Sequence, residues 1–276
     1  MLEALTALLK LALYAGLLSS SGAVFVQATL RPLPEEQESL TQLSWRGSTL
    51  VLVTVPLLAL VLMLRLGGAF DAATLSAVFL SSSGAALCLQ VTGAFLLLIS
   101  TIDDDGVVRL SYAMLPMLAF AFSGHAAAIG PLEGLVAVAH VSVAAWWLGS
   151  LYFLRRACAL ARAERVVTAV ARFSSLAFIL TAVLVVAGLV LVMILVDFSL
   201  DPWSSPYGWI LATKLCVVAV LLAVAGYNRR RLTPRLLAGD GAAVGALRRT
   251  IGIELALIAL ILTITAILTT YTAPPD

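Results

Sequence analysis

Residues 175–196 read SLAFILTAVLVVAGLVLVMILV, a run of 22 residues without a single charge. A helix of that length is about 33 Å long, which is enough to cross the hydrocarbon core of a bilayer. The rest of the chain has the same character, because 62% of its residues are hydrophobic, 12% are charged and the mean hydropathy is +1.07. A soluble domain carries roughly 25% charged residues. The sequence therefore predicts an integral membrane protein.

Charged residues separate the apolar runs and mark the ends of the expected helices. We predict an all-α fold, a bundle of eight transmembrane helices that forms one membrane domain over residues 1–276. We expect the first helix to be retained, because Lys10 interrupts the apolar run where a signal peptide would be most hydrophobic. The predicted spans are residues 3–29, 46–65, 73–100, 109–128, 133–155, 172–197, 207–228 and 250–272.

The distribution of arginine predicts the orientation of the bundle. The connections after the fifth and seventh spans hold eleven arginines between Arg155 and Arg249, and such connections are usually cytoplasmic. Alternation then places the Arg31–Arg46 and Asp103–Asp105 loops inside and both termini outside. We expect the acidic residues of these two inner loops to be solvated rather than to bind metal.

The chain has only two histidines, His125 and His140, on either side of a predicted external turn at Gly130 and Pro131. Neighbouring antiparallel helices pack about 8–10 Å apart, so the two imidazoles can converge on one ion. Ionisable side chains within a bilayer are costly and usually face a functional cavity. The pair therefore predicts a metal site at the outer face.

Sulfur-containing and aromatic residues extend the candidate site inward. Met117 and Met114 precede His125 on the same helix and share a helical face, so we predict them as further metal ligands. Met193 and Cys216 are possible secondary ligands. Trp147 lies two turns from His140 on the same face, where it either packs beneath the site or contacts the ion through its ring as a further secondary ligand.

Other polar residues within the spans are predicted to hold or gate the bundle. Lys214 lies near the expected depth of His140, where it reaches outward to water, pairs with an acid such as Asp197 or Asp201, or is uncharged; we favour the ion pair. Glu254 lies one turn inside its span, at the level of Asn228 and Arg172, which can donate hydrogen bonds to it.

Five motifs in the C-terminal half carry a family resemblance. They are SGHAAAIG (123–130), AHVSVAAWWLGSLYFLRRA (139–157), ARFSSLAFILTAVLVVAGLVL (171–191), YGWILATKLCVVAVLLAVAGYNRRRLTPRL (207–236) and LRRTIGIELALIALILTITAILTTYTAPP (247–275). In this order they resemble the bacterial CopD copper-resistance family, also called PcoD. Residues 109–276 carry the CopD-like helices, and residues 1–108 are less recognisable.

The resemblance implies a multi-pass protein of the bacterial inner membrane that works with a periplasmic CopC-type copper chaperone and passes copper inward. Copper fits the predicted ligands, because imidazole suits Cu(II) and thioether suits Cu(I). We expect no enzymatic activity, since the chain has no phosphate loop, dinucleotide fingerprint or HExxH helix.

Two alternatives remain open at the level of sequence. Two histidines on neighbouring helices can ligate haem, as in a HemJ-like oxidoreductase, although a tight turn leaves little room for the macrocycle. The second alternative is a copper-binding assembly factor or sensor that never moves the ion.

Overall fold

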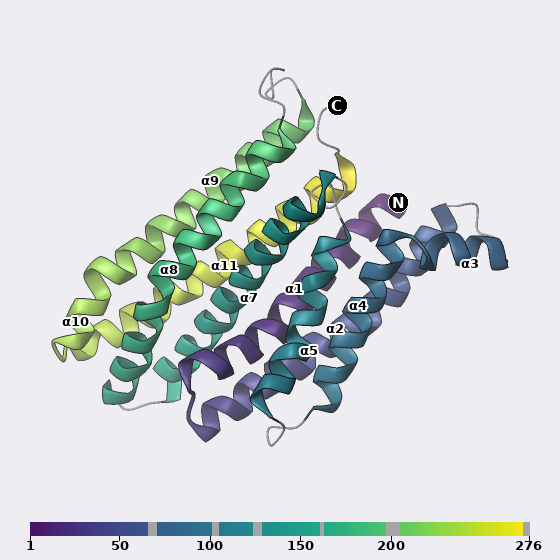
Figure 1. Cartoon of the computed structure of the whole chain (residues 1–276). Helices are drawn as coiled ribbons and strands as arrows, with labels where there is room; N and C mark the ends of the chain where they lie inside the picture. Colours follow the sequence, from purple (N-terminus) through teal and green to yellow (C-terminus); the bar gives the residue numbers. More distant parts are fainter. Residues whose placement is uncertain (66–70, 101–104, 124–128, 161–162, 197–204, 273–276) are drawn as a thin grey trace.

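The computed structural model describes residues 1–65, 71–100, 105–123, 129–160, 163–196 and 205–272. All regular structure in these ranges is helical, which confirms the predicted fold class (Figure 1). Seven helical segments within them are long and apolar enough to cross a membrane. They are α1 (Leu2–Leu30), α2 (Pro34–Arg65), α4 (Ser82–Ile99), α7 (Pro131–Leu160), α8 (Ala163–Leu195), α9 (Pro206–Tyr227) with the turns that extend it, and α11 (Gly241–Tyr271).

The predicted fourth span, residues 109–128, is represented by a shorter helix. It consists of α5 (Gly106–Leu118) and the 3-10 turn η1 (Ala119–Ala121), and residues 124–128 lie outside the described part of the chain. The segment Gly106–Ala121 is about 24 Å long at 1.5 Å per residue. It is too short to count as a full crossing, so the number of full spans among the described residues is seven.

The predicted third span, residues 73–100, is two helices rather than one. A break at Leu80 and Ser81 separates α3 (Ala72–Phe79) from α4. Ser81 caps α4, because its hydroxyl oxygen accepts a hydrogen bond of 3.1 Å from the backbone N–H of Gly84. Serine is a preferred N-cap residue, so the SSSG sequence restarts the helix inside an otherwise apolar run.

The predicted inner loop from Arg31 to Arg46 is also corrected. The helix α2 already begins at Pro34, and only residues 31–33 connect it to α1. Proline is favoured in the first turn of a helix, and Glu35 and Glu36 complement the positive end of the helix dipole. These start signals extend α2 well beyond its apolar part.

The helix α1 is packed closely on two sides, against α2 and α7. A Cβ atom added at Gly22 would lie 2.1 Å from the backbone oxygen of Ala145, and one added at Gly149 would lie 2.4 Å from that of Gly22. On the other side, a Cβ atom at Gly47 would lie 2.7 Å from the oxygen of Gly16. Small residues therefore bring these backbones into contact, as they do in many membrane helix pairs.

The helices α8 and α9 are much less enclosed. In the most apolar window of each helix, 61% of residues are buried for α1, but only 6% for α8 and 11% for α9. The helix α8 packs mainly against α7, and α9 packs mainly against α11. Both present long apolar faces to the outside, which agrees with a lipid environment.

The ends of the helices agree with the predicted alternation. The α1–α2 connection and the short α10 (Thr233–Leu237) lie at one end of the bundle, and the start of α1 lies at the other (Figure 1). The Lys10 ammonium donates a hydrogen bond to the Thr269 carbonyl, which places the beginning of α1 beside the end of α11. Lys10 is thereby held at the end of the bundle that we predict to be external.

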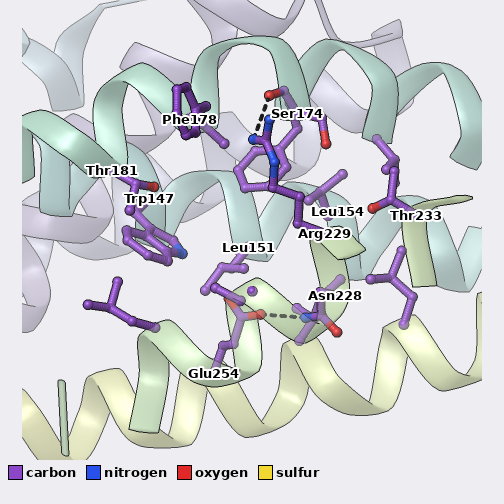
Figure 2. A pocket seen from close by; sticks show the side chains of 18 of the residues that line it. Trp147, Leu151, Leu154, Ser174, Phe178, Thr181, Asn228, Arg229, Thr233 and Glu254 are labelled. Atoms are coloured by element: carbon purple, nitrogen blue, oxygen red, sulfur yellow. Dashed lines mark hydrogen bonds between the residues drawn. The ribbon is translucent and has the colours of Figure 1, made fainter. Parts of the chain in front are cut away.

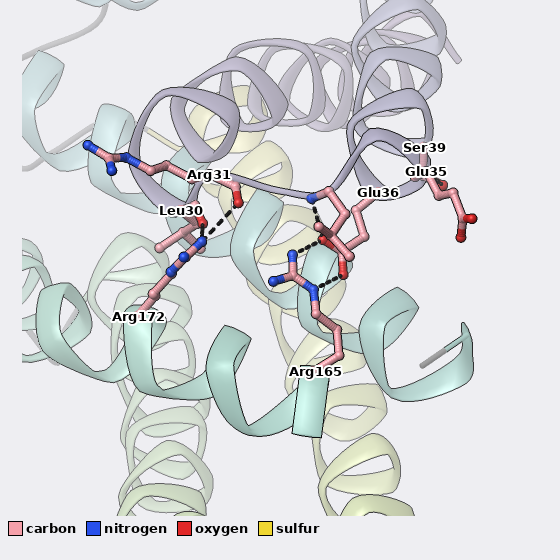
Figure 3. Close-up of polar contacts among 8 residues, drawn as sticks. Leu30, Arg31, Glu35, Glu36, Ser39, Arg165 and Arg172 are labelled. Atoms are coloured by element: carbon pink, nitrogen blue, oxygen red, sulfur yellow. Dashed lines mark hydrogen bonds and ion pairs between the residues drawn. The ribbon is translucent and has the colours of Figure 1, made fainter. Parts of the chain in front are cut away.

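An ion pair joins the N-terminal hairpin of α1 and α2 to α8 (Figure 3). The Arg165 guanidinium donates two hydrogen bonds to the Glu36 carboxylate, which also accepts one from the Leu33 N–H. Glu36 is 5% exposed, so the prediction of a solvated acidic loop is wrong for this residue. Arg172, expected near Glu254, instead donates to the carbonyl oxygens of Leu30 and Arg31.

Candidate functional site

His140 lies on α7, and its ring is turned toward α8. Its Nδ1 is 3.2 Å from the carbonyl oxygen of Leu184. A carbonyl oxygen only accepts, so a neutral His140 in this contact carries its proton on Nδ1. The lone pair of Nε2 is then free to bind a metal, and an imidazole fixed through its other nitrogen is the usual arrangement of a histidine ligand.

Gly188 provides the space in which the ring lies. A Cβ atom added there would be 3.1 Å from Cε1 of His140 and 3.4 Å from Nδ1. Leu184 and Gly188 are one turn apart on α8, so the same turn provides the carbonyl that bonds the imidazole and the space for its ring. The sequence shows a lone glycine in an aliphatic run, but only the packing of α7 on α8 shows which side chain uses it.

Lys214 on α9 interacts electrostatically with His140, and this places the two residues near each other, as predicted from their depths. Among the described residues Lys214 forms no ion pair. Its expected partner Asp197 lies outside the described ranges, and so does His125, the other member of the predicted pair. The described site thus consists of one imidazole and one nearby ammonium.

The two methionines predicted as inner ligands belong to the core around α5. Met117 is fully buried, and Met114 is half-buried against the same core. The helix α5 packs against α1 and α4, whereas His140 contacts α8. Imidazole and thioethers therefore lie against different helices.

The possible secondary ligands lie on the outer surface of the bundle. Met193 is 72% exposed on α8, and Cys216 is exposed on α9. In a membrane these side chains face lipid. In the described ranges no three residues of the type His, Cys, Asp or Glu come together as a metal-binding group.

A second polar site lies around Asn228 and Glu254, with Arg229 nearby (Figure 2). Asn228 begins a π-helical turn, η3 (Asn228–Leu232), that continues α9 into α10, and π-helical turns often occur at functional sites. Its side-chain amide donates a hydrogen bond of 2.5 Å to the Glu254 carboxyl group on α11. The structure thus places Asn228 beside Glu254, at the level expected from the sequence.

This pair lines a cavity of about 320 Å³ between α7, α8, α9 and α11. Trp147 forms part of its wall, two turns along α7 from His140. At the rim, Arg229 donates to the Ser174 carbonyl, and its guanidinium lies 4.9 Å from the centre of the Phe178 ring. The sequence indicated the individual polar residues but not the cavity, because no local pattern reports the space between four helices.

Trp146, the neighbour of Trp147, is a packing residue. Its indole N–H donates to the hydroxyl of Thr29 at 2.9 Å, and its ring stacks on Phe173. Adjacent tryptophans on α7 therefore face different surroundings: Trp146 ties α7 to α1 and α8, and Trp147 faces the cavity.

Comparison with known proteins identifies the C-terminal region. Residues 167–268 match the family model described as CopD, copper resistance protein D. They include Lys214, Asn228 and Glu254 but begin after His140 on α7. No curated protein and no solved structure gives a match. The match confirms, over these residues, the resemblance seen in the sequence, and the apolar helices agree with a multi-pass membrane protein.

Proposed function

We propose that this protein receives copper at the outer face of the bacterial inner membrane and passes it inward through the helix bundle. The CopD match supports copper as the cargo. We place the outer site at His140 and His125, with the membrane orientation that the arginine-rich connections favour. In this orientation both termini are external, and residues 109–128 as a whole make the eighth crossing.

The geometry of His140 is the observation that carries the proposal. A half-buried imidazole with Nδ1 held by the Leu184 carbonyl presents Nε2 as a fixed donor, and Gly188 keeps the space around the ring open. Imidazole nitrogen is a good ligand for Cu(II).

The sulfur ligands suit a later step. Thioethers favour Cu(I), so Met117 and Met114 would take copper only after a soluble thiol reductant has supplied one electron to Cu(II). Both methionines pack in the hydrophobic core around α5, so they are enclosed by protein. We therefore separate an outer imidazole site from an inner thioether site.

Lys214 sets the affinity of the outer site in this proposal. An ammonium group near a metal site disfavours the bound cation, and a transport site must release its ion as well as bind it. A site of modest affinity is also suited to delivery by a soluble CopC-type partner, because such a carrier can transfer copper to it directly.

The test is copper binding and copper flux with purified protein. Wild-type protein should bind Cu(II), and His140→Ala should lower the affinity by at least about tenfold, as loss of one ligand requires. The His125→Ala, His140→Ala variant should abolish both binding and uptake into proteoliposomes. Met193→Leu is the matched control, because Met193 is on the lipid-facing side of α8.

Separate outcomes contradict separate parts of the proposal. Full copper binding by the double variant would remove the histidines from the site. Binding without flux would favour a sensor or assembly factor. Loss of flux with retained Cu(II) binding in Met117→Leu would support the inner thioether step, and unchanged flux would exclude it.

A further inference from the structure

The cavity beside Glu254 has an apolar body. Its walls include Leu151, Phe173, Leu222 and Ile251, contributed by α7, α8, α9 and α11 in turn. Phe178 also lines the cavity and is 65% exposed on the outside of α8, so the cavity reaches the surface that we assign to lipid. A volume of about 320 Å³ is at the lower end of the range typical of small-molecule sites, roughly 300–1,000 Å³.

The other end of the cavity is polar and incompletely paired. Trp147 and Asn228 are both more than nine-tenths buried. The indole N–H of Trp147 lies beside Glu254 without reaching hydrogen-bond geometry, and the side-chain oxygen of Asn228 has no partner. The cavity therefore holds one free donor and one free acceptor on either side of a carboxyl group that is already bonded to the Asn228 amide (Figure 2).

Unpaired buried polar atoms cost free energy unless something bonds to them. A hydroxyl group suits this end of the cavity, because its oxygen can accept from the Trp147 N–H and its proton can be donated to the neighbouring Glu254 carboxyl oxygen. An anion is disfavoured by the Glu254 carboxyl group. A metal ion lacks its ligands here, since the described residues hold no group of three His, Cys, Asp or Glu.

We propose that this cavity binds an uncharged, lipid-soluble molecule of phenol-like size with one hydroxyl group. The hydroxyl group lies beside Trp147 and Glu254, and the apolar body lies among the aromatic and aliphatic walls toward Phe178. The molecule reaches the site from the membrane, between α8 and α9. This site is separate from the outer imidazole site and requires no copper.

The test uses 4-bromo-2,6-diethylphenol and its methyl ether with purified full-length protein in detergent. Bromine quenches tryptophan fluorescence at short range, so Trp147 reports occupancy. We expect saturable quenching by the phenol and at least about tenfold weaker binding of the ether, which keeps the apolar body but cannot donate. Trp147→Phe should remove the saturable part of the quenching.

Two variants fill the cavity from different helices, so that one still tests the proposal if the other fails to fold. Ala177→Phe fills the cavity from α8 and Ala225→Phe from α9, and each should abolish saturable quenching. Ala219→Phe, on the exposed face of α9, is the matched control and should leave it unchanged. Equal affinity for phenol and ether would show that water alone serves the polar end, and saturable binding that survives both fillings would place the phenol elsewhere. Either result overturns the proposal without affecting the copper measurements.

Discussion

The N-terminal hairpin and the C-terminal helices of this protein are packed in opposite ways. In the hairpin, glycine backbones of α1 contact those of α2 and α7, and most of α1 is enclosed. In the C-terminal region, α8 and α9 present most of their surface to lipid and leave a cavity between them and their partners. The CopD match covers the second region and not the first.

This difference indicates that the N-terminal hairpin is the scaffold and that the C-terminal helices hold the candidate sites. Close backbone packing tolerates no added atoms, so it makes a rigid support, whereas looser packing leaves room for ions and small molecules. His140 and Trp147 lie on α7, which contacts both α1 and α8. The polar residues of the loose region are therefore held against the rigid one through α7.

The largest expected effect comes from breaking the rigid region. Gly22→Ala places a methyl group on the backbone oxygen of Ala145, so α1 and α7 must separate. We expect a loss of about 3 kcal/mol of unfolding free energy, the upper part of the range for overpacking. Unfolding in mixed micelles measures it. Gly252→Ala on α11, where an added Cβ meets nothing within 4 Å, is the control and should be neutral. Equal stability of the two variants would refute close packing as the basis of the scaffold.

A smaller effect is expected where the two regions are joined. Glu36→Gln removes the ion pair with Arg165, and we expect a loss of about 2 kcal/mol, less than for a fully buried pair because Arg165 is partly exposed. Glu35→Gln changes an exposed neighbour and should have no effect. If the effects of Glu36→Gln and Arg165→Gln simply add in the double variant, the two side chains do not interact.

A third variant alters the outer site and leaves the packing of both regions intact. Gly188→Ala crowds the His140 ring, so we expect the Kd for Cu(II) to rise about tenfold, or about 1.4 kcal/mol, with little change in stability. Isothermal titration with copper measures the Kd. Unchanged affinity would mean that the ring orientation seen here is not the one that binds copper.

The smallest effect is expected at the solvated turn before α11. Hydrogen bonds from Arg235, at 2.7 and 3.0 Å, hold the pKa of the Asp240 carboxyl below its ordinary value. A lowered folded-state pKa stabilises the protein above the unfolded pKa of about 3.9, and this contribution is lost as the pH falls through the lowered value. Asp240→Asn keeps a capping side chain on α11 but removes the ion pair, so its unfolding free energy should change less than that of wild-type protein between pH 6 and pH 3. An identical pH profile would exclude the ion pair as a source of stability.

Prediction from the sequence was successful where the signal is local. Apolar runs predicted the helices, and arginine-rich segments predicted which connections lie at the same end of the bundle. It failed at positions where capping competes with hydropathy. Ser81 ends one helix and begins another, and Pro34 begins a helix inside a predicted loop.

The candidate site was only partly predictable for a different reason. Sequence can mark His140, Lys214 and Glu254 as costly residues within apolar helices, and the structure places Asn228 beside Glu254. The sequence cannot assign hydrogen-bond partners that depend on how each helix is rotated about its axis. Arg172 was expected at Glu254 but faces the α1–α2 connection, because α8 packs on that side of the bundle.

Consecutive residues alone indicate a helical membrane protein whose C-terminal region resembles the CopD family, because hydropathy and sequence motifs are local signals. The tertiary structure decided what those residues face. The Leu184 carbonyl that orients His140, the space left by Gly188, and the cavity between four helices all arise from contacts between segments far apart in the chain. Such contacts depend on how the helices are rotated and spaced against one another, and that is set by the packing of the whole bundle.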